Sequence, residues 1–475
     1  MFDKILLKYF SLPVTVKTAF WFAICQFLQK GISMITTPVF TRLLSTTEYG
    51  IASTFVAWTS VVTPIITLST WRAMMNLFSR DNCSKKVLSS CIFMSIFISF
   101  ILSIVIFCLQ EYIEKIASVT GVFLWLVIIF SVTQNIFFAW MTKLQYEYKY
   151  KPIIIATLLN TAITSIVGVC CVYFYSRTAF SKIYPQVICA FIISLYILYN
   201  SIRNSGTFFN KDLWWFSLGF SVPLIPHYLS EVILQSSDRI MINSLCSSSD
   251  VAIYSIAYSV ANLIFLAVGS VNSSFVPYQY QKIKSREFKK LAVTSNFVIA
   301  FVAVVMFFVM LFGYEIVLIF GGRKYIESVS LIIPISLGVF FNYLFQLFAR
   351  VQEYFEQKYT IVIASVACAL LNIVLNYIFI RLYGYKAAAY TTFACYFFFC
   401  ILHYFFYKKC CKKNIGREIY DIKCLSFISV ILILSSFFIN AVSNVFLIKY
   451  LILSVFILLF VFYRDYFISF IKRFV

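Results

Sequence analysis

Charged residues are scarce in this chain of 475 residues: only 12% are Asp, Glu, Lys or Arg, whereas 62% are hydrophobic. A soluble protein of this size carries about 25% charged residues, so this sequence lacks the polar surface that would cover a water-soluble globule. A soluble enzyme, a disordered chain and a disulfide-stapled secreted domain are therefore excluded. With a mean hydropathy of +0.90, the sequence predicts an all-α polytopic membrane protein.

The chain also lacks the sequence signatures of several kinds of chemistry. It has no Walker A motif for ATP hydrolysis, and its 14 cysteines include no CxxC pair and no zinc-binding spacing. No loop between apolar segments exceeds about 20 residues, which leaves no room for a soluble catalytic domain on either face. We expect no enzyme activity, no cofactor, no metal and no nucleic acid partner.

Apolar segments of about 20 residues, the length that crosses a ~30 Å hydrocarbon core as a helix, occur fourteen times along the chain. The seventh segment is the least apolar because it contains two prolines, His227, Glu231 and Gln235, and without it the pattern predicts thirteen spans. The predicted spans are 17–40, 50–70, 87–109, 121–142, 153–175, 181–200, 214–237, 251–276, 294–314, 329–350, 360–381, 386–407, 425–444 and 447–463.

The basic residues test this count of spans. If the N-terminus lies inside and each span switches the side, 28 basic residues lie in inside segments, 10 lie in outside segments, and Lys30 lies within a span. This bias is the one that the positive-inside rule requires. Omitting the seventh span would place the basic 278–290 loop outside. The fourteen-span arrangement predicts that both termini are cytoplasmic, and most of the net charge of +21 then serves orientation.

Two pairs of similar segments indicate an internal duplication. LLSTTEYGIAS (43–53) and LCSSSDVAIYS (245–255) match at an offset of 202, and YEYKYKPIIIAT (146–157) resembles YFEQKYTIVIAS (354–365) at an offset of 208. The two offsets predict two six-helix lobes, residues 1–205 and 206–412, related by a pseudo-two-fold axis along the membrane normal. Residues 413–475 then form two additional C-terminal helices. The alternative is a chance similarity between apolar segments.

Polar residues recur at helical spacing within three predicted spans, where they are costly and usually face a bundle interior or an aqueous cavity. We therefore predict one central substrate cavity. Its candidate residues are Gln26 and Lys30 in the first span, His227, Glu231, Asp238 and Arg239 in or next to the seventh, and Asn342, Gln346 and Arg350 in the tenth.

Each of these candidates also has a purely structural interpretation. Lys30 could extend to the membrane interface or pair with Glu231, and Asp238 with Arg239 could form an ordinary ion pair at a helix end. Arg350 could anchor the helix on the cytoplasmic side, and His227 could be a hydrogen-bonded residue of the bundle. The cationic members nevertheless favour an anionic substrate, because Arg and Lys both bind phosphate.

Three segments together resemble a known family. They are QFLQKG (26–31) followed by TPVFTRLLSTTEYG (37–50), VPLIPHYLSEVILQSSDRIMI (222–242) with DVAIYSIAYS (250–259), and LLNIVLNYIFIRLYGYKAAAYTT (370–392). The chain resembles Wzx-type O-antigen flippases of the polysaccharide transporter family, in the multidrug/oligosaccharidyl-lipid/polysaccharide superfamily. Lys30, Asp238 and Arg239 fall on motif positions, whereas His227, Glu231 and Arg350 come from helical spacing alone.

The resemblance implies that an undecaprenyl-diphosphate-linked oligosaccharide is moved from the cytoplasmic to the periplasmic leaflet of a bacterial inner membrane by alternating access. It implies a polysaccharide polymerase and a chain-length regulator as partners, and it leaves open whether protons or sodium drive transport. Two alternatives remain: a cation-coupled multidrug exporter of the same superfamily, which predicts an acidic cavity, and an integral-membrane glycosyltransferase, which predicts a long outer segment and an acidic pair there.

Overall fold

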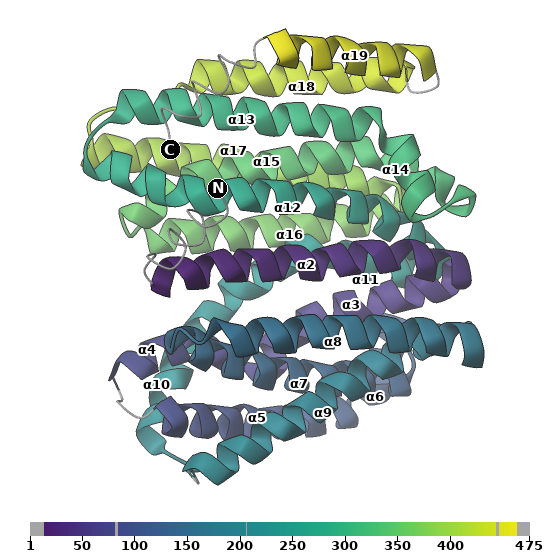
Figure 1. Cartoon of the computed structure of the whole chain (residues 1–475), viewed down its shortest axis with the longest axis vertical. Helices are drawn as coiled ribbons and strands as arrows, with labels where there is room; N and C mark the ends of the chain where they lie inside the picture. Colours follow the sequence, from purple (N-terminus) through teal and green to yellow (C-terminus); the bar gives the residue numbers. More distant parts are fainter. Residues whose placement is uncertain (1–13, 81–83, 206, 443–445, 463–475) are drawn as a thin grey trace, which may run out of the picture.

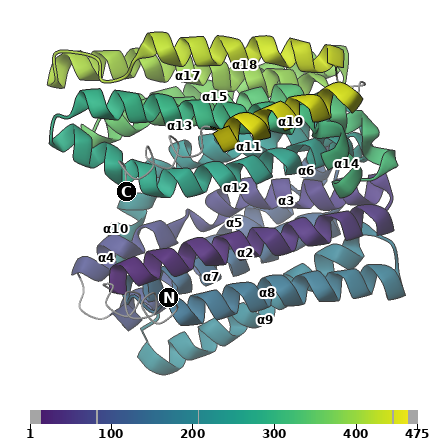
Figure 2. The same cartoon turned by 45° about the horizontal axis from the view of Figure 1, so that its top comes forward.

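The computed structural model describes residues 14–80, 84–205, 207–442 and 446–462, and within these ranges every regular element is a helix. Figures 1 and 2 show long helices running side by side in two groups, with the first half of the chain below and the second half above. The first half contains α2 (Val14–Leu43), α3 (Thr46–Thr67), α5 (Ser84–Cys108), α7 (Gly121–Tyr146), α8 (Tyr150–Cys170) and α9 (Ala179–Ser205).

The second half contains the longest helix and six further long ones, of which the last belongs to the predicted C-terminal pair. They are α11 (Ile225–Leu245), α12 (Ser248–Lys284), α13 (Phe288–Leu311), α15 (Val329–Tyr354), α16 (Lys358–Tyr383), α17 (Ala387–Asn414) and α18 (Ile422–Val442), followed by the shorter α19 (Phe446–Phe462). The short elements are η1 (Thr70–Arg72), α4 (Met74–Arg80), α6 (Gln110–Ala117), η2 (Cys171–Tyr175), α10 (Lys211–Ser221), η3 (Val222–Leu224), α14 (Gly313–Phe320) and η4 (Arg323–Ser328).

The helices confirm the predicted class of an all-α polytopic membrane protein. Ten helices of the described ranges are long and apolar enough to cross a membrane. The other four predicted spans correspond to α2, to α10 with α11, to α12 and to α19, which has 17 residues. The count of fourteen spans, the symmetry of the lobes and the cytoplasmic termini therefore stay predictions, and both termini lie outside the described residues.

The seventh predicted span, 214–237, is two helices with a 3₁₀ turn between them instead of one continuous helix. Proline has no N–H to donate and ends a helix, and here Pro223 stands in η3 and Pro226 opens α11. The two helices also pack differently, because α10 packs on the first half and α11 packs on both halves. In α10, the Trp214 Nε1–H donates to the Ser90 carbonyl oxygen of α5 (3.2 Å), whereas α11 packs against α16 and α3.

The two copies of the duplicated motif contact each other. Each begins a helix in the same way, with the hydroxyl oxygens of Ser45 and Ser247 accepting the N–H groups of Glu48 (3.1 Å) and Asp250 (3.2 Å). The Ser249 hydroxyl donates to Thr46 Oγ1 across the interface (2.9 Å). We call this region, residues 41–50 with residues 243–249 and 319–325, the junction, because it joins the first and second halves at one end of the helices.

Further contacts hold the junction together. The Thr41 hydroxyl donates to the Phe320 carbonyl oxygen (2.6 Å), and the Lys324 ammonium donates to the Leu44 carbonyl oxygen (2.5 Å). Each of these carbonyls lies at or just beyond a helix end, where a main-chain oxygen lacks a partner in its own helix. The two halves are therefore bound to one another through helix ends at the junction.

The C-terminal pair of helices packs on α13. Figure 1 shows α18 and α19 beside it at the edge of the molecule. The Phe456 ring of α19 meets the Phe308 ring of α13 edge-on, with centroids 4.7 Å apart. Lys449, which is 2% exposed, pairs with Glu315 of α14 at 3.2 Å. A buried lysine needs such a partner, so this ion pair fixes α19 against the rest of the bundle.

Candidate functional site

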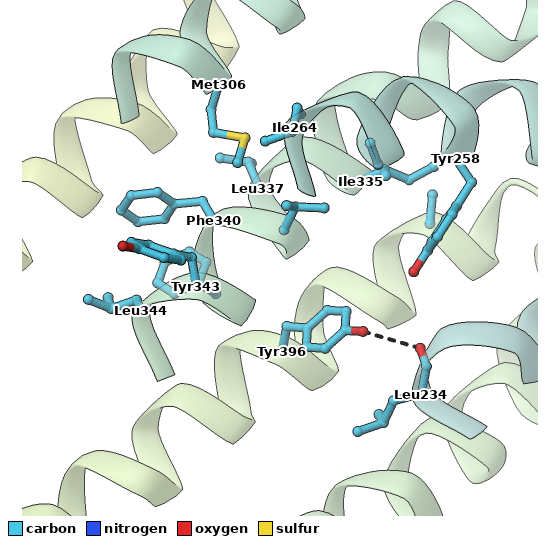
Figure 3. Close-up of a cluster of buried hydrophobic side chains, with 14 of the residues drawn as sticks. Leu234, Tyr258, Ile264, Met306, Ile335, Leu337, Phe340, Tyr343, Leu344 and Tyr396 are labelled. Carbon is cyan, nitrogen blue, oxygen red and sulfur yellow. Dashed lines mark hydrogen bonds between the residues drawn. The ribbon is translucent and has the colours of Figure 1, made fainter. Parts of the chain in front are cut away.

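A polar cavity of about 300 Å³ lies between α11, α15, α16 and α17. Because α11 packs against α3 as well as α16, the cavity borders the interface between the two halves. Its apolar wall includes Leu234 and Tyr396, whose hydroxyl donates to the Leu234 carbonyl oxygen at 3.4 Å (Figure 3). The cavity contains five of the nine predicted site residues: His227, Glu231, Asn342, Gln346 and Arg350.

On α11, the predicted i, i+4 pair of His227 and Glu231 is formed. His227 Nε2 lies 3.8 Å from Glu231 Oε1, and the Glu231 side chain is 56% exposed. His227 Nδ1 is buried and has no hydrogen-bond partner among the described residues. The predicted alternative partner of Glu231, Lys30, makes no ion pair with it within the described part of the chain. The pair thus presents one imidazole and one carboxylate to the cavity.

On α15, the predicted stripe is one face of the helix, as the four-residue spacing requires. The Gln346 amide N–H donates to Asn342 Oδ1 (2.9 Å), and the Arg350 guanidinium donates to Glu353 Oε2 (2.7 Å). Glu353 also accepts a hydrogen bond from the Tyr280 hydroxyl (3.4 Å). Arg350 therefore enters the cavity with its charge balanced by a carboxylate, and the site is not a strongly cationic one.

His403 of α17 also lines the cavity, and its part in the site was not predicted from the sequence. The Gln352 amide nitrogen lies 3.0 Å from His403 Nδ1 and 3.2 Å from the His403 carbonyl oxygen. The carbonyl oxygen can only accept, so the amide atom beside it is the nitrogen, and Oε1 points to the Thr360 hydroxyl (3.1 Å). Because the amide nitrogen can only donate, Nδ1 accepts and Nε2 carries the proton in the neutral ring.

The Nε2–H of His403 is consequently a donor without a partner. Nε2 is buried and makes no hydrogen bond within the described residues. The ring is held on both sides, because Phe345 stacks on it (centroids 5.2 Å apart) and Phe399 meets it edge-on (4.6 Å). A fixed, unpaired donor buried in the wall of a polar cavity is suited to an acceptor atom of a molecule that reaches this wall.

Asp238 lies outside this cavity, in a closed hydrogen-bond network. The side chain is 1% exposed, and it accepts hydrogen bonds from Tyr254, from the Asn376 amide (2.6 Å) and from the Thr392 hydroxyl (2.8 Å). The network continues from Asn376 to Thr391 and to Asn372. These residues come from α11, α12, α16 and α17, so the carboxylate joins four helices.

The three remaining candidates are also outside the polar cavity. The Arg239 guanidinium lies 4.7 Å from the centroid of the Tyr258 ring, a cation–π contact, and its Nε is buried without a partner among the described residues. Gln26 and Lys30 are exposed on α2 and do not line it. Whether all nine candidates act on one substrate stays a prediction.

The chemistry available in the polar cavity is hydrogen bonding, ion pairing and ring stacking. Amide, imidazole, guanidinium and carboxylate groups stand beside the rings of Phe345, Tyr396 and Phe399. In the described ranges, no group of three or more His, Cys, Asp and Glu side chains is arranged to hold a metal ion. This mixture of donors, acceptors and aromatic faces fits a polyhydroxylated ligand better than an apolar cation.

Comparisons with known proteins identify the family of this membrane protein. Residues 15–281 match the model of the family described as polysaccharide biosynthesis protein, and residues 223–378 match the family MatE. A protein of the Lsg locus of Haemophilus influenzae is 30% identical over 169 residues, which are 32% of this chain and 41% of that protein. The chain therefore matches about two fifths of that relative's length.

Solved structures show the same fold. The lipid II flippase MurJ in an inward closed conformation aligns with a TM-score of 0.68 at 18% identity, over 94% of this chain and 99% of that chain. A multidrug resistance MATE family transporter of the MOP superfamily, in an inward-facing conformation, aligns with a TM-score of 0.61 at 12% identity, over 85% and 99% of the two chains. At these sequence identities, the similarity shows a shared fold alone.

Proposed function

The chain belongs to the polysaccharide biosynthesis protein family of membrane transporters, and we propose that it is a flippase for an undecaprenyl-diphosphate-linked oligosaccharide, such as an O-antigen repeat unit. It moves this substrate from the cytoplasmic to the periplasmic leaflet of a bacterial inner membrane. It is a transporter without enzyme activity, and it works beside a polysaccharide polymerase and a chain-length regulator. Its basic loops face the cytoplasm.

The observation that supports this substrate class is the composition of the polar cavity. A site for an apolar drug cation would present an acidic, largely apolar surface. Here Arg350, three amides and two histidines stand with two carboxylates beside aromatic rings. Such groups bind sugar hydroxyls by hydrogen bonds and sugar faces by stacking. A volume of about 300 Å³ accommodates part of the oligosaccharide, and the lipid remains in the bilayer.

The transport cycle in this proposal is alternating access of two lobes, residues 1–205 and 206–412, with residues 413–475 as an additional pair of helices. The junction holds the lobes together at one end. Opening there and closing at the opposite end would expose the cavity to each side in turn. The break at Val222–Leu224 separates α10, packed on the first lobe, from α11, so it lies where the lobes must bend apart.

Ion coupling, by protons or sodium, would use His227 and Glu231. They face each other at 3.8 Å beside the cavity, so protonation of either changes the charge that the substrate meets. Lys30 and Arg350 are the proposed contacts to the diphosphate. Arg350 would serve by exchanging Glu353 for phosphate.

The test is reconstitution of the purified chain in liposomes with a fluorescent undecaprenyl-diphosphate oligosaccharide, whose sugar is cleaved by an enzyme added outside. Flipping exposes nearly all of the substrate to cleavage, whereas empty liposomes protect about half of it. Protection equal to that in empty liposomes overturns the proposal. The same preparation is offered a fluorescent drug cation and a nucleotide sugar. Drug uptake without flipping would establish the exporter, and sugar transfer would establish the glycosyltransferase.

A further inference from the structure

Two cavities lie end to end on the flank of the first half, both between α5, α7 and α9. The first, of about 270 Å³, is polar and is lined by Lys85, Trp140, Lys143, Tyr196, Asn200 and Asn204 among others. The second, of about 480 Å³, is lined by apolar side chains of 96–107, 125–136 and 191–198. They adjoin along α7, because Ile136 and Trp140 are one turn apart on the same face of that helix.

We propose that the two cavities form one binding groove, here called the flank groove, for a polyprenyl phosphate lipid. The phosphate occupies the polar cavity, and the isoprenoid chain occupies the apolar one. The flank groove is separate from the polar cavity of the second half and shares no residue with it. The choice of a polyprenyl lipid rests on the proposed function, whereas the presence of an amphiphilic groove rests on the two cavities alone.

The polar cavity of the flank groove carries a net positive charge. The Lys85 ammonium is exposed and makes no hydrogen bond or ion pair with the described residues. Lys143 lies 3.9 Å from Glu147, and the residues that line this cavity include two lysines and no carboxylate. Lysine is a strong point donor to phosphate, and the Asn200 amide adds a neutral donor.

In the rest of the flank groove, the hydroxyl groups donate within their own helices. The hydroxyls of Ser103, Thr133 and Ser194 donate to the carbonyl oxygens of Ser99 (2.6 Å), Phe130 (2.8 Å) and Ala190 (2.7 Å). All other side chains that line this part are hydrocarbon or aromatic. Phe100, Ile104 and Leu195 are exposed large hydrophobic residues, so the groove opens outward to where a bilayer would lie. An apolar chain can enter from the side.

The length of the flank groove distinguishes a polyprenyl chain from a phospholipid. From Lys143 at the polar end to Trp125 at the apolar end, α7 rises about 27 Å at 1.5 Å per residue. An acyl chain fills one leaflet, which is about half of a ~30 Å hydrocarbon core. It would therefore leave the far part of the groove empty. A chain that passes the middle of the bilayer fills the whole groove.

The experiment uses the full chain in nanodiscs and a polyprenyl phosphate with a photoreactive diazirine near the end of its chain. After irradiation, mass spectrometry locates the labelled peptides. We expect labelling in 96–107, 125–136 and 191–198. Leu195→Trp fills the groove and should lower labelling at least fivefold. Ile192→Trp is the matched control, because Ile192 is exposed on the same helix but does not line the groove.

The phosphate end is tested with Lys85→Gln, which should also lower labelling at least fivefold. The control is Lys86→Gln, because Lys86 is exposed next to Lys85 but does not line the groove. Unlabelled polyprenyl phosphate should compete. Farnesyl phosphate has the same headgroup on a short chain, and phosphatidylglycerol has an anionic headgroup on acyl chains, so both should compete at least tenfold less well.

Labelling spread evenly over all bilayer-facing helices, equal competition by phosphatidylglycerol, or equal labelling of Leu195→Trp and Ile192→Trp would each overturn the flank groove. Because labelling does not depend on transport, its result is separable from that of the flipping assay. Flipping without labelling in the groove would contradict the flank groove and leave the proposed function standing. Labelling in the groove without flipping would contradict the proposed function and leave the lipid-binding groove standing.

Discussion

Gly50 of α3 lies directly against the main chain of Ser248, the first residue of α12, at the junction. A Cβ atom placed on Gly50 would stand 1.6 Å from the Ser248 carbonyl oxygen, a distance that no packing allows. The two residues belong to the two copies of the duplicated motif, and beside them Ser249 donates to Thr46. The close approach of the halves at this end therefore requires glycine at position 50.

Gly50→Ala should weaken the junction. Overpacking of a tight contact costs about 1–3 kcal/mol, which is roughly a 5- to 150-fold shift from the closed to the open junction. Amide hydrogen exchange of residues 243–249 should accelerate accordingly. Gly31→Ala is the control, since a Cβ on Gly31 meets no atom within 4 Å. Unchanged exchange in Gly50→Ala would show that the halves do not meet here in the membrane.

Asp238→Ala should destabilise the whole bundle, because three donors, from Tyr254, Asn376 and Thr392, would lose their acceptor. Each buried donor left without a partner costs about 1–3 kcal/mol. Asp238→Asn should lose less, because the two hydroxyls can rotate and accept from the new amide. The measurement is the thermal melting temperature in detergent. Equal melting of Asp238→Ala and the parent would show that the network does not stabilise the bundle.

The sequence predicted the helical class and part of the candidate site, and the reasons differ by residue. Asn342, Gln346 and Arg350 share a face because helical spacing alone fixes it, and the structure places all three in one cavity. The break before α11 was visible as Pro223 and Pro226, but the hydropathy window joined both sides into one span. Proline geometry outweighs mean hydropathy at that position.

Helical spacing could not predict the positions of residues that depend on contacts between helices far apart in the sequence. His403 has no charged or amide side chain at helical spacing, and its partner Gln352 is on another helix. Asp238 continues the polar stripe of α11, yet its partners on α16 and α17 draw it into a closed network. Lys30 and Glu231 are both charged, but no ion pair joins them in the described residues. Tertiary packing determines which polar groups meet.

His403→Phe should impair transport without unfolding the protein. Phenylalanine keeps the aromatic contacts with Phe345 and Phe399 but removes the unpaired Nε2–H, which is buried in the wall of the cavity. One lost hydrogen bond to substrate costs about 0.5–1.5 kcal/mol, or roughly a 2- to 13-fold higher half-saturating substrate concentration. Flipping is measured at several substrate concentrations, with melting as the check on folding.

Ser429→Ala is the control for His403→Phe, because Ser429 is buried on α18 and donates only to the carbonyl oxygen of Leu425. A half-saturating concentration unchanged in both variants would remove His403 from the substrate site. Loss of flipping together with a lower melting temperature in His403→Phe would show that the Gln352–His403 contact serves stability.

The loop before α13 should respond to acid. Glu287 accepts hydrogen bonds from Lys290 and Lys282, and these contacts lower its pKa from about 4.5 to about 2. A carboxyl whose pKa is lowered in the folded state stabilises the loop above its unfolded pKa, and this contribution fades as the pH falls from about 4 toward 2. Amide exchange of residues 284–290, corrected for the intrinsic pH dependence, should therefore rise in that window. Glu287→Gln should remove the change. Glu356→Gln, in the short loop between α15 and α16, is the control and should keep it. A parent loop whose corrected exchange is flat from pH 5 to 2 would show that the two lysines do not hold Glu287.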